Sequence, residues 1–284
     1  MDTQPERYEA KADFSGIYNR ADPRAYFRTL GALDYEIPRH GVPVFERLLD
    51  AMGGREGKTV LDVCCSYGVN AAMLNHDIDL EDLGEHYASV GAVDATSLDE
   101  IDRDWFASRR RADAVRTVGL DVAENAVRYA TSVGLLDRGV VANLETSSVD
   151  ADDLEALGSA DLVTVTGGIG YIGERTLRTV AEASGDDPPW IAALSLRWLD
   201  FEPIARSLDG IGFVTESVPG YCVPQRRFAG DEERRAAYSG LRERGLDPSP
   251  ELQSDAHFAE LFVVRPTDAV REAPIDDVLG PLAG

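Results

Sequence analysis

The sequence predicts an α/β protein built on a doubly wound sheet, and three observations support this prediction. Residues 59–74, TVLDVCCSYGVNAAML, read as a short buried strand, a loop of small residues and a helix, which is how a nucleotide-binding βαβ unit begins. Strand-like and helical runs then alternate along the chain, five of each. Two further strand-like segments, 212–218 and 258–264, close the pattern and bring the expected number of strands to seven.

Two helices are predicted before the first strand. Asp22-Pro23 is a helix start, because proline suits the first helical turn, and apolar residues follow at helical spacing. A second helix is predicted over residues 40–52, just before the helix-ending pair Gly53-Gly54. We expect residues 1–54 to form an N-terminal helical cap that folds over a ligand or packs on the sheet.

The other elements follow from the hydrophobic periodicity of the chain. Core strands are predicted at residues 60–63, 114–121, 139–144, 160–166 and 189–196. Helices are predicted at residues 69–74, 123–133, 149–157, 174–184 and 201–208, with some helical pattern between 226 and 255. We expect a ligand-binding domain over residues 55–268, with its site at the carboxyl ends of the strands, and a peripheral tail over 269–284.

One insertion interrupts this alternation before the second strand. Residues 75–113 indicate two or three short helices with acidic outer faces. The connection between the first helix and the second strand normally lies at the amino ends of the strands, away from a ligand. We therefore expect an added lobe or a dimer surface here rather than a substrate lid.

Composition excludes several classes of protein. The chain has 284 residues and a net charge of −23, from 51 acidic and 28 basic residues. Nucleic acid is an unsuitable partner because its phosphates would be repelled, whereas a salt-adapted surface explains the charge directly. The apolar fraction of 44% is enough for a sizeable core, and no apolar run is long enough to span a membrane.

Cysteine and histidine usage points to a reducing compartment and gives no metal site. The three cysteines include the vicinal pair Cys64-Cys65, which is poorly placed to form a bridge. The four histidines are scattered along the chain without ligand spacing. The polar N-terminus does not resemble a signal peptide. We expect a cytoplasmic protein that needs no metal.

The loop at residues 64–68, Cys-Cys-Ser-Tyr-Gly, narrows the choice of ligand. A pyrophosphate requires a loop with several glycines, and this loop supplies only Gly68. A dinucleotide enzyme would also place an acidic residue about 20 residues after the loop, whereas here an insertion separates the loop from Asp121. A nucleoside without phosphates tolerates cysteine and serine in this loop more easily.

From residue 44 to residue 265 the chain resembles the class I S-adenosylmethionine-dependent methyltransferases. The resemblance rests on Leu61-Asp62-Val63 with its loop, on Gly119-Leu120-Asp121-Val122, on Ala142-Asn143-Leu144, and on residues 160–168. It implies a Rossmann-like sheet whose last strand is antiparallel, and S-adenosylmethionine as the cofactor or sole substrate. Cys64 and Ser66 stand where the family usually has glycine. The residues that the resemblance places at the cofactor are Asp62, Cys64, Ser66, Gly68, Asp121, Val122, Asn143, Leu144, Thr166, Gly167 and Gly168.

Three residues are candidates for the chemistry. Tyr171 follows the fourth strand, where the family places substrate contacts, and an aromatic face can stabilise a sulfonium cation. Asn143 and Tyr18 are the other two candidates. Tyr18, Tyr26 and Tyr35 all belong to the cap, where each taken alone is better explained by packing in the core or at the rim. Cys64 and Cys65 are better read as small loop residues than as nucleophiles.

Three functions remain open. The first is a transferase of secondary metabolism that acts on a small molecule by in-line displacement at a sulfonium carbon. The second follows from a resemblance of residues 26–38 and of the loop to azetidine-2-carboxylate synthases, in which the α-amine of S-adenosylmethionine attacks its own γ-carbon and methylthioadenosine leaves. The third is a ligand-binding protein with a decayed site. In each case we expect a small-molecule partner, and a homodimer is an option.

Overall fold

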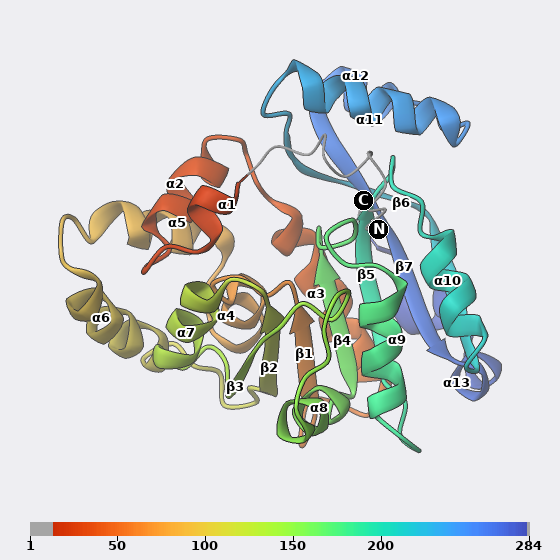
Figure 1. The fold of residues 1–284 in the computed structure, drawn as a ribbon, viewed down its shortest axis with the longest axis horizontal. Coiled ribbons are helices and arrows are strands. Elements are labelled where there is room, and N and C mark those ends of the chain that lie inside the picture. The colour runs from red at the N-terminus through yellow and green to blue at the C-terminus, as the bar shows by residue number, and fades with distance from the viewer. Residues whose placement is uncertain (1–13, 283–284) are drawn as a thin grey trace.

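The computed structural model describes residues 14–282 and contains one seven-stranded sheet (Figure 1). The strand order is β3-β2-β1-β4-β5-β7-β6. Strands β1 to β5 are parallel to one another, and β7 runs antiparallel to both β5 and β6. This confirms the predicted fold class, including the reversed last strand. The first 13 residues of the predicted cap and the last two of the predicted tail lie outside the described residues.

The observed elements keep the predicted alternation. The strands are β1 (Thr59–Val63), β2 (Arg116–Asp121), β3 (Arg138–Val141), β4 (Leu162–Thr166), β5 (Trp190–Leu196), β6 (Phe213–Arg227) and β7 (Ala256–Pro266). The helices up to β4 are α1 (Ser15–Tyr18), α2 (Arg24–Gly31), α3 (Ile37–Ala51), α4 (Val69–Asn75), α5 (Leu80–Ser89), α6 (Ala95–Ala107), α7 (Glu124–Ser132) and α8 (Ala151–Gly158). The later helices are α9 (Glu174–Ala183), α10 (Glu202–Asp209), α11 (Asp231–Glu243), α12 (Ser249–Ser254), α13 (Thr267–Glu272) and α14 (Ile275–Leu279).

Helices cover both faces of the sheet, so the central strands are buried on both sides. All five residues of β1 are buried, as expected for a parallel strand between two helical layers. Helices α3, α4 and α7 contribute to the core on one face. Helices α8, α9 and α10 contribute to the core on the other face. The carboxyl ends of β1, β2 and β4 therefore open at one edge between these two layers.

Strand β6 is longer than the sequence predicts. The alternating pattern predicts a strand only up to residue 218, and Pro219-Gly220 follows it. In the structure the pairing with β7 shifts register between Ser217 and Cys222 and then continues to Arg227. Gly220 takes a positive φ of 80° at this irregularity. The Pro-Gly pair thus marks a bulge within one strand rather than its end.

The C-terminal segment packs against the body of the protein instead of being merely peripheral. Ile275 and Leu279 of α14 are buried, and α14 contacts α3. The guanidinium of Arg47 on α3 donates to the carbonyls of Leu279 and Pro281. Periodicity over five residues was too short to predict this helix.

The insertion folds into α5 and α6. The buried side chain of Asn75, at its start, hydrogen-bonds to residues that follow its end. Asn75 donates from Nδ2 to the carbonyl oxygen of Val115 and to Oγ1 of Thr117, both at 2.9 Å, and it accepts from the Val115 amide. Helix α5 contacts α2, and α6 contacts α7. The insertion therefore stands beside the N-terminal helices, and none of its residues lines the cavity described below.

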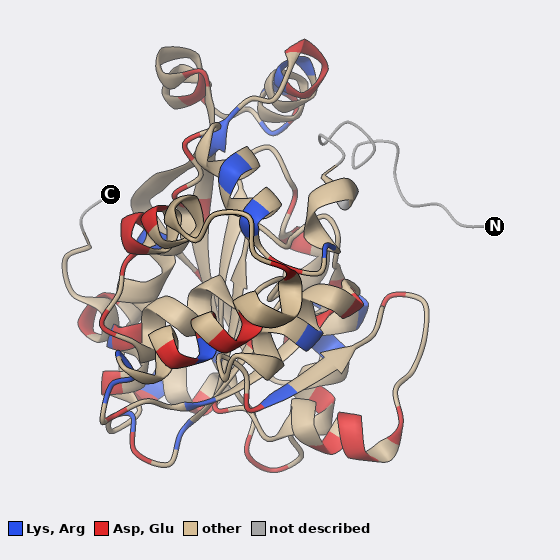
Figure 2. Cartoon of the chain, turned by 90° about the vertical axis from the view of Figure 1, so that its left-hand side faces the viewer, with Lys and Arg blue, Asp and Glu red and all other residues tan. Residues whose placement is uncertain are grey.

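Acidic side chains are distributed over the helices and loops around the sheet (Figure 2). Several are fixed at helix starts, such as Asp79 and Asp150, whose carboxylates accept backbone N–H groups of the first turn. Across residues 14–282 no helix is both long and apolar enough to cross a bilayer.

Candidate functional site

A cavity of about 540 Å³ lies at the carboxyl ends of β1, β2 and β4. Its floor is the loop after β1, one wall comes from the ends of β2 and β4, and the opposite wall comes from the N-terminal cap. Eleven of the residues proposed from the sequence line it: Tyr18, Cys64, Ser66, Asp121, Val122, Asn143, Leu144, Thr166, Gly167, Gly168 and Tyr171. The topology thus collects residues from positions 18 to 171 around one space.

Asp62 and Gly68 are not among the lining residues. Asp62 is buried directly behind the loop. Gly68 caps α4 with a φ of 78°, and a Cβ there would lie 3.2 Å from Cβ of Ala130. The local backbone and the packing of α7 therefore account for glycine at position 68 without a ligand.

The loop keeps a left-handed backbone although its glycines are missing. Cys64 has a φ of 61° and Ser66 a φ of 49°, values that non-glycine residues rarely adopt. Gly68 then begins α4, so the loop turns sharply into the helix. The backbone of this loop therefore has the left-handed conformation that glycine favours, although Cys64 and Ser66 carry side chains.

Two glycines from neighbouring segments, Gly119 on β2 and Gly168 in the loop after β4, make room for the cysteines. A Cβ on Gly168 would lie 2.9 Å from Sγ of Cys64, and one on Gly119 would lie 2.7 Å from Sγ of Cys65. The space that the cysteine side chains need is therefore left by glycines on either side of the loop. Burial raises the pKa of the Cys65 thiol well above its usual value, which keeps it protonated and unreactive.

Asp121 ties the end of β2 to the loop. Its Oδ2 accepts the Ser66 amide at 2.8 Å and its Oδ1 accepts the Ala123 amide at 2.9 Å. Burial raises the pKa of the Asp121 carboxyl, while these hydrogen bonds oppose the rise. Each oxygen still has accepting capacity toward the cavity. The carboxylate can therefore orient the loop and accept a ligand hydroxyl at the same time.

Asp62 and Asn70 form a buried polar pair beneath the loop. Asn70 donates from Nδ2 to Oδ1 of Asp62 at 2.8 Å and to Oγ1 of Thr166 at 2.9 Å. Thr164 donates to the same Asp62 oxygen at 2.9 Å. Asn70 lines the cavity. It is a polar residue in the otherwise apolar run VNAAML, and that contrast was the signal that could have identified it.

Aromatic rings of the cap form the wall that faces the loop. Phe14, Tyr18, Tyr26 and Tyr35 all line the cavity. The rings of Tyr18 and Tyr26 meet edge to face at 5.6 Å, and those of Tyr26 and Tyr35 at 6.2 Å. Burial raises the pKa of Tyr26 well above its usual value and the pKa of Tyr35 to about 12. These phenols therefore remain neutral over the whole physiological range.

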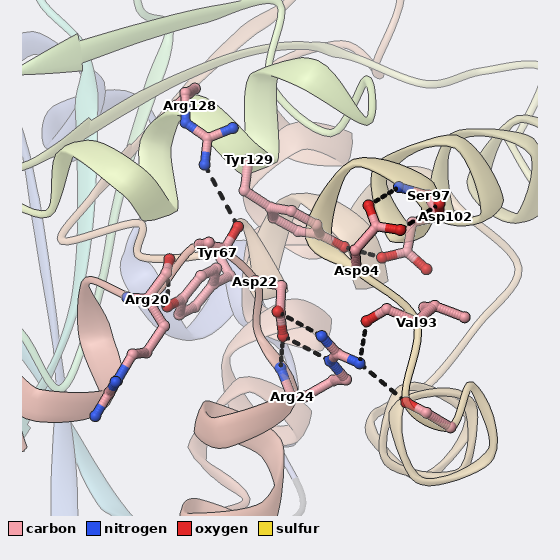
Figure 3. A network of polar contacts seen from close by, with 12 residues as sticks. Arg20, Asp22, Arg24, Tyr67, Val93, Asp94, Ser97, Asp102, Arg128 and Tyr129 are labelled. Carbon is pink, nitrogen blue, oxygen red and sulfur yellow. Dashed lines mark hydrogen bonds and ion pairs between the residues drawn. The ribbon is translucent and has the colours of Figure 1, made fainter.

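Tyr67 of the loop fastens the cap to this floor. Its hydroxyl accepts the Arg20 amide at 2.9 Å and lies 3.0 Å from the carbonyl oxygen of Ile17. Arg24 of α2 pairs with Asp22 and donates to the carbonyl of Val93 in the insertion at 2.9 Å (Figure 3). Loop, cap and insertion are thus joined by polar contacts, and the insertion supports the cap from outside.

The far end of β6 holds the cap from the other side. The carbonyl of Gln225 accepts the Glu36 amide at 2.8 Å, and the Arg227 amide donates to Leu33 at 2.7 Å. The Gln225 side chain also lies against Gly167, where a Cβ would come within 2.3 Å of its Nε2. The part of β6 that the sequence did not predict therefore helps to enclose the site.

Asn143 and Tyr171 lie at the mouth of the cavity. Both are exposed, and Tyr171 retains 52% of its exposure. Oδ1 of Asn143 accepts the Glu145 amide at 3.0 Å, which stabilises the turn after β3. The exposure of Tyr171 shows that its ring is not a core packing residue.

The cavity has no basic lining. Its described lining residues include one carboxylate, Asp121, and no lysine, arginine or histidine. The rest are aromatic, aliphatic or neutral polar. Within residues 14–282, no three side chains of the metal-binding types come together to hold an ion.

Comparison with known proteins gives neighbours only at the level of structure. No model of a known protein family matches the sequence. No curated protein matches it either.

Solved structures similar to this chain include three named as methyltransferases. A TehB-like S-adenosylmethionine-dependent methyltransferase from Corynebacterium glutamicum is 14% identical over 84% of this chain and 93% of its own, with a TM-score of 0.40. The N-methyltransferase NodS from Bradyrhizobium japonicum, in complex with S-adenosyl-L-homocysteine, is 12% identical over 91% and 98%, with a TM-score of 0.42. The plantazolicin methyltransferase BamL is 12% identical over 91% and 97%, with a TM-score of 0.42.

Proposed function

We propose that this protein is an S-adenosylmethionine-dependent transferase that acts on a small molecule. The observation that carries the proposal is the chemical character of the cavity. Its lining offers aromatic faces and oxygen acceptors, with Asp121 as its carboxylate and no basic side chain among the described residues. Such a lining suits a ligand with a positive centre and several hydrogen-bond donors.

The residues fit the parts of S-adenosylmethionine in one order along the cavity. Asp121 would accept the ribose hydroxyls, and the apolar side chains of Val122 and Leu144 would pack beside the adenine. The loop at residues 64–68 and the end of β4 would hold the methionine part. The tyrosine rings of the cap would lie near the sulfonium, where an aromatic face stabilises positive charge.

The same lining argues against a nicotinamide dinucleotide. A pyrophosphate carries negative charge and is usually held by several glycine amides at the helix start. Here Asp121 accepts the Ser66 amide, so a carboxylate already occupies one of the loop's donors. A phosphate beside that carboxylate would be repelled.

The reaction that this site supports is displacement at a carbon bonded to the sulfonium sulfur. In methyl transfer, a nucleophile of the acceptor forms a bond to the methyl carbon, and the carbon–sulfur bond breaks with its electron pair on sulfur. Tyr171, at the mouth, would contact an acceptor, and Asn143 and Tyr18 would orient it. Alignment of the reacting atoms is the main contribution that such a site makes.

Cyclisation of S-adenosylmethionine to azetidine-2-carboxylate is the second candidate. The observation that favours it is the loop, because Cys64 and Ser66 carry side chains where glycine usually leaves open space. These side chains alter the room available to the methionine part and can fold it back toward the sulfonium. The α-amine would then attack the γ-carbon, and methylthioadenosine would leave.

Incubation with S-adenosylmethionine alone separates the candidates. Methylthioadenosine formed without an acceptor establishes cyclisation, whereas S-adenosylhomocysteine formed only with an acceptor establishes methyl transfer. Tight binding with neither product would indicate a ligand-binding protein. Stabilisation by NAD but not by S-adenosylmethionine would refute the proposal altogether.

Asp121→Ala tests the ribose contact directly. We expect this variant to lose about 1–3 kcal/mol of binding free energy for S-adenosylmethionine, because charge-assisted hydrogen bonds disappear and the loop loses an anchor. Isothermal calorimetry measures the loss. Asp161→Ala, which removes an acid at the opposite, amino end of β4, is the control and should bind normally. Unchanged binding by Asp121→Ala would show that the ribose lies elsewhere.

A further inference from the structure

One side of the cavity is lined by aromatic rings from two separate parts of the chain. Phe14, Tyr18, Tyr26 and Tyr35 come from the cap, and Tyr171 comes from the loop after β4. We call these five side chains the aromatic subsite. The proposed function places the sulfonium beside these rings, so a nucleophile that attacks it must approach over them. The subsite therefore bears on the identity of the acceptor.

The rings of the aromatic subsite contact one another and leave flat apolar faces toward the cavity. Phe14 meets Tyr18 edge to face, with 6.4 Å between the ring centroids, and Tyr18 meets Tyr26 in the same way at 5.6 Å. Burial is the main cause of the raised pKa of the Tyr18 phenol, and the phenols of Tyr35 and Tyr171 raise it further. A planar ring suits such surroundings, because aromatic pairs stack or meet edge to face.

The lining offers an acceptor no free carboxylate or imidazole to take its proton. The phenols of Tyr18, Tyr26 and Tyr35 all have raised pKa values and stay neutral. Asp121 is the one carboxylate among the described lining residues, which include no histidine or lysine. Its two oxygens already accept backbone amides, and the proposed function assigns it to the ribose. A nucleophile that must lose a proton would lack a general base here.

The lining also offers no partner for an anionic acceptor. The guanidinium of Arg226 lies 4.9 Å from the centroid of the Phe14 ring, but Arg226 does not line the cavity. It is buried and paired with the buried carboxylate of Glu233, so its charge is balanced. A carboxylate or phosphate in the aromatic subsite would lose its hydration without gaining a counter-charge, which is costly.

We propose that the acceptor is a neutral aromatic heterocycle that is methylated on a ring nitrogen. This inference rests on the proposed function, because it names the second substrate of the same site. A pyridine-type nitrogen has a lone pair in the plane of its ring and no proton to lose. It forms a bond to the methyl carbon, and the bond between that carbon and sulfur breaks with its electron pair on sulfur. The positive charge moves from sulfur to nitrogen, and no base is needed.

The aromatic subsite favours this transfer because it contacts the charge before and after the reaction. Ring faces attract a cation, most strongly where water is excluded. The charge of the sulfonium and the charge of the methylated heterocycle lie on opposite sides of the same transferred methyl group. The rings that stabilise the first can therefore stabilise the second without rearrangement.

Quinoline is the probe for the reaction. With S-adenosylmethionine it should give N-methylquinolinium and S-adenosylhomocysteine in equal amounts, measured by mass spectrometry. Naphthol has two fused rings of the same size but must lose a proton, and quinolinecarboxylate adds a negative charge to the same heterocycle. Each should react at least about a hundredfold more slowly than quinoline. Methylation of either at the rate of quinoline, or no methylation of quinoline, would overturn the inference.

Binding of the product tests the aromatic subsite itself. In calorimetry on the protein saturated with S-adenosylhomocysteine, N-methylquinolinium should bind about tenfold more tightly than quinoline. Salt at about 0.5 M screens the surface charge during these titrations. Tyr18→Leu should remove most of this preference, whereas Tyr18→Phe keeps the ring and should retain it. Equal binding of the two compounds to the unaltered protein, or an unchanged preference in Tyr18→Leu, would contradict the proposal.

The outcomes separate this inference from the proposed function. If S-adenosylmethionine binds but quinoline is not methylated, the inference fails and the proposed function stands. Methylthioadenosine formed without an acceptor would have the same meaning, because cyclisation uses no second substrate. Failure of S-adenosylmethionine to bind at all would overturn both.

Discussion

Left-handed residues in the loop after β1 show how a side chain can replace glycine without changing the backbone. Cys64 and Ser66 both have positive φ, and each such residue costs roughly 1–2 kcal/mol relative to glycine in that conformation. The flanking glycines at 119 and 168 accept the cysteine side chains. The strain is therefore retained at the point where the loop meets the cavity, which is where functional strain usually occurs.

Ser66→Gly should increase the stability of the ligand-free protein. The substitution relieves the left-handed backbone and removes Oγ, which is buried and has no hydrogen-bond partner. Glycine also increases the entropy of the unfolded chain, which offsets part of this gain, so the net increase in the free energy of unfolding should be about 0.5–1 kcal/mol. Urea unfolding measures this increase. Gly68→Ser is the converse change and should destabilise, since position 68 is left-handed and closely packed. A less stable Ser66→Gly protein would mean that the loop is not strained.

Asp62 should make stability depend on pH in an unusual direction. Its pKa is about 7 in the folded protein and lower, near 3.8, when unperturbed, so the folded state binds more protons between these values. The contribution of Asp62 is therefore most favourable below about pH 4 and is lost as the pH rises toward 7. Each pH unit in this window corresponds to about 1.4 kcal/mol.

Asp62→Asn removes this dependence. Relative to the unaltered protein, the variant should gain about 3 kcal/mol more stability at pH 8 than at pH 4.5. Urea titrations at both pH values measure the difference. Glu85→Gln, at an exposed position on α5, is the matched control and should change the difference between the two pH values far less than Asp62→Asn does. An equal shift for Asp62→Asn would show that its carboxyl is ionised throughout.

A buried chain of hydrogen bonds joins α5, α6 and α7. Asp102 on α6 is fully buried and lies 2.6 Å from Nε2 of His86 on α5. Its other oxygen accepts the hydroxyl of Tyr129 on α7, also at 2.6 Å. Because the Tyr129 proton is used there, the Tyr87 hydroxyl must donate to Tyr129 across their 2.6 Å contact. This chain positions the insertion that supports the cap.

Tyr129→Phe should destabilise the protein more than Tyr87→Phe. The first variant leaves both the Tyr87 hydroxyl and one Asp102 oxygen without a partner, which should cost about 1–3 kcal/mol. The second removes only the last donor of the chain and should cost about 1 kcal/mol. Chemical denaturation compares the two. Equal losses would show that the chain does not have this direction.

The elements show where sequence reasoning succeeds and where it stops. Strands β1 to β5 were predicted because each is a short apolar run between helices of clear periodicity. The continuation of β6 was missed because Pro219-Gly220 looks the same at a strand end and at a bulge, and only pairing with β7 distinguishes the two. The support that α5 gives to α2 was missed for a similar reason, since it depends on contacts between distant segments.

Part of the candidate site could be predicted from the sequence, and part required the fold. Asp121 and the loop could be placed because a parallel sheet brings its carboxyl ends together. Asn70 is marked by its polarity within an apolar run, but its partners could not be predicted, because they are the buried Asp62 carboxyl eight residues earlier and Thr166 on a different strand. The aromatic wall required the fold as well, since nothing in the spacing of Tyr18, Tyr26 and Tyr35 indicates that they converge.

The charge of the whole molecule has consequences for its stability. A net charge of −23 on 284 residues creates self-repulsion that opposes the compact state. Acidic positions occur on many helices and loops (Figure 2), so the repulsion is spread over the surface and cannot be relieved by one counter-charge. Mobile salt ions screen it, because the screening length falls from about 10 Å at 0.1 M salt to about 3 Å at 1 M.

Stability should therefore rise with sodium chloride. We expect the melting temperature in calorimetry to increase by several degrees between about 0.05 M and 0.5 M, and to change less above that, because screening saturates. Glu85→Gln combined with Glu100→Gln removes two exposed charges from the insertion and should reduce this dependence. Sodium sulfate at equal ionic strength distinguishes screening from preferential exclusion, which stabilises folded proteins generally and continues to grow with concentration. A melting temperature that is flat up to 0.5 M chloride and rises only with sulfate would mean that repulsion among the acidic side chains does not limit the stability of this fold.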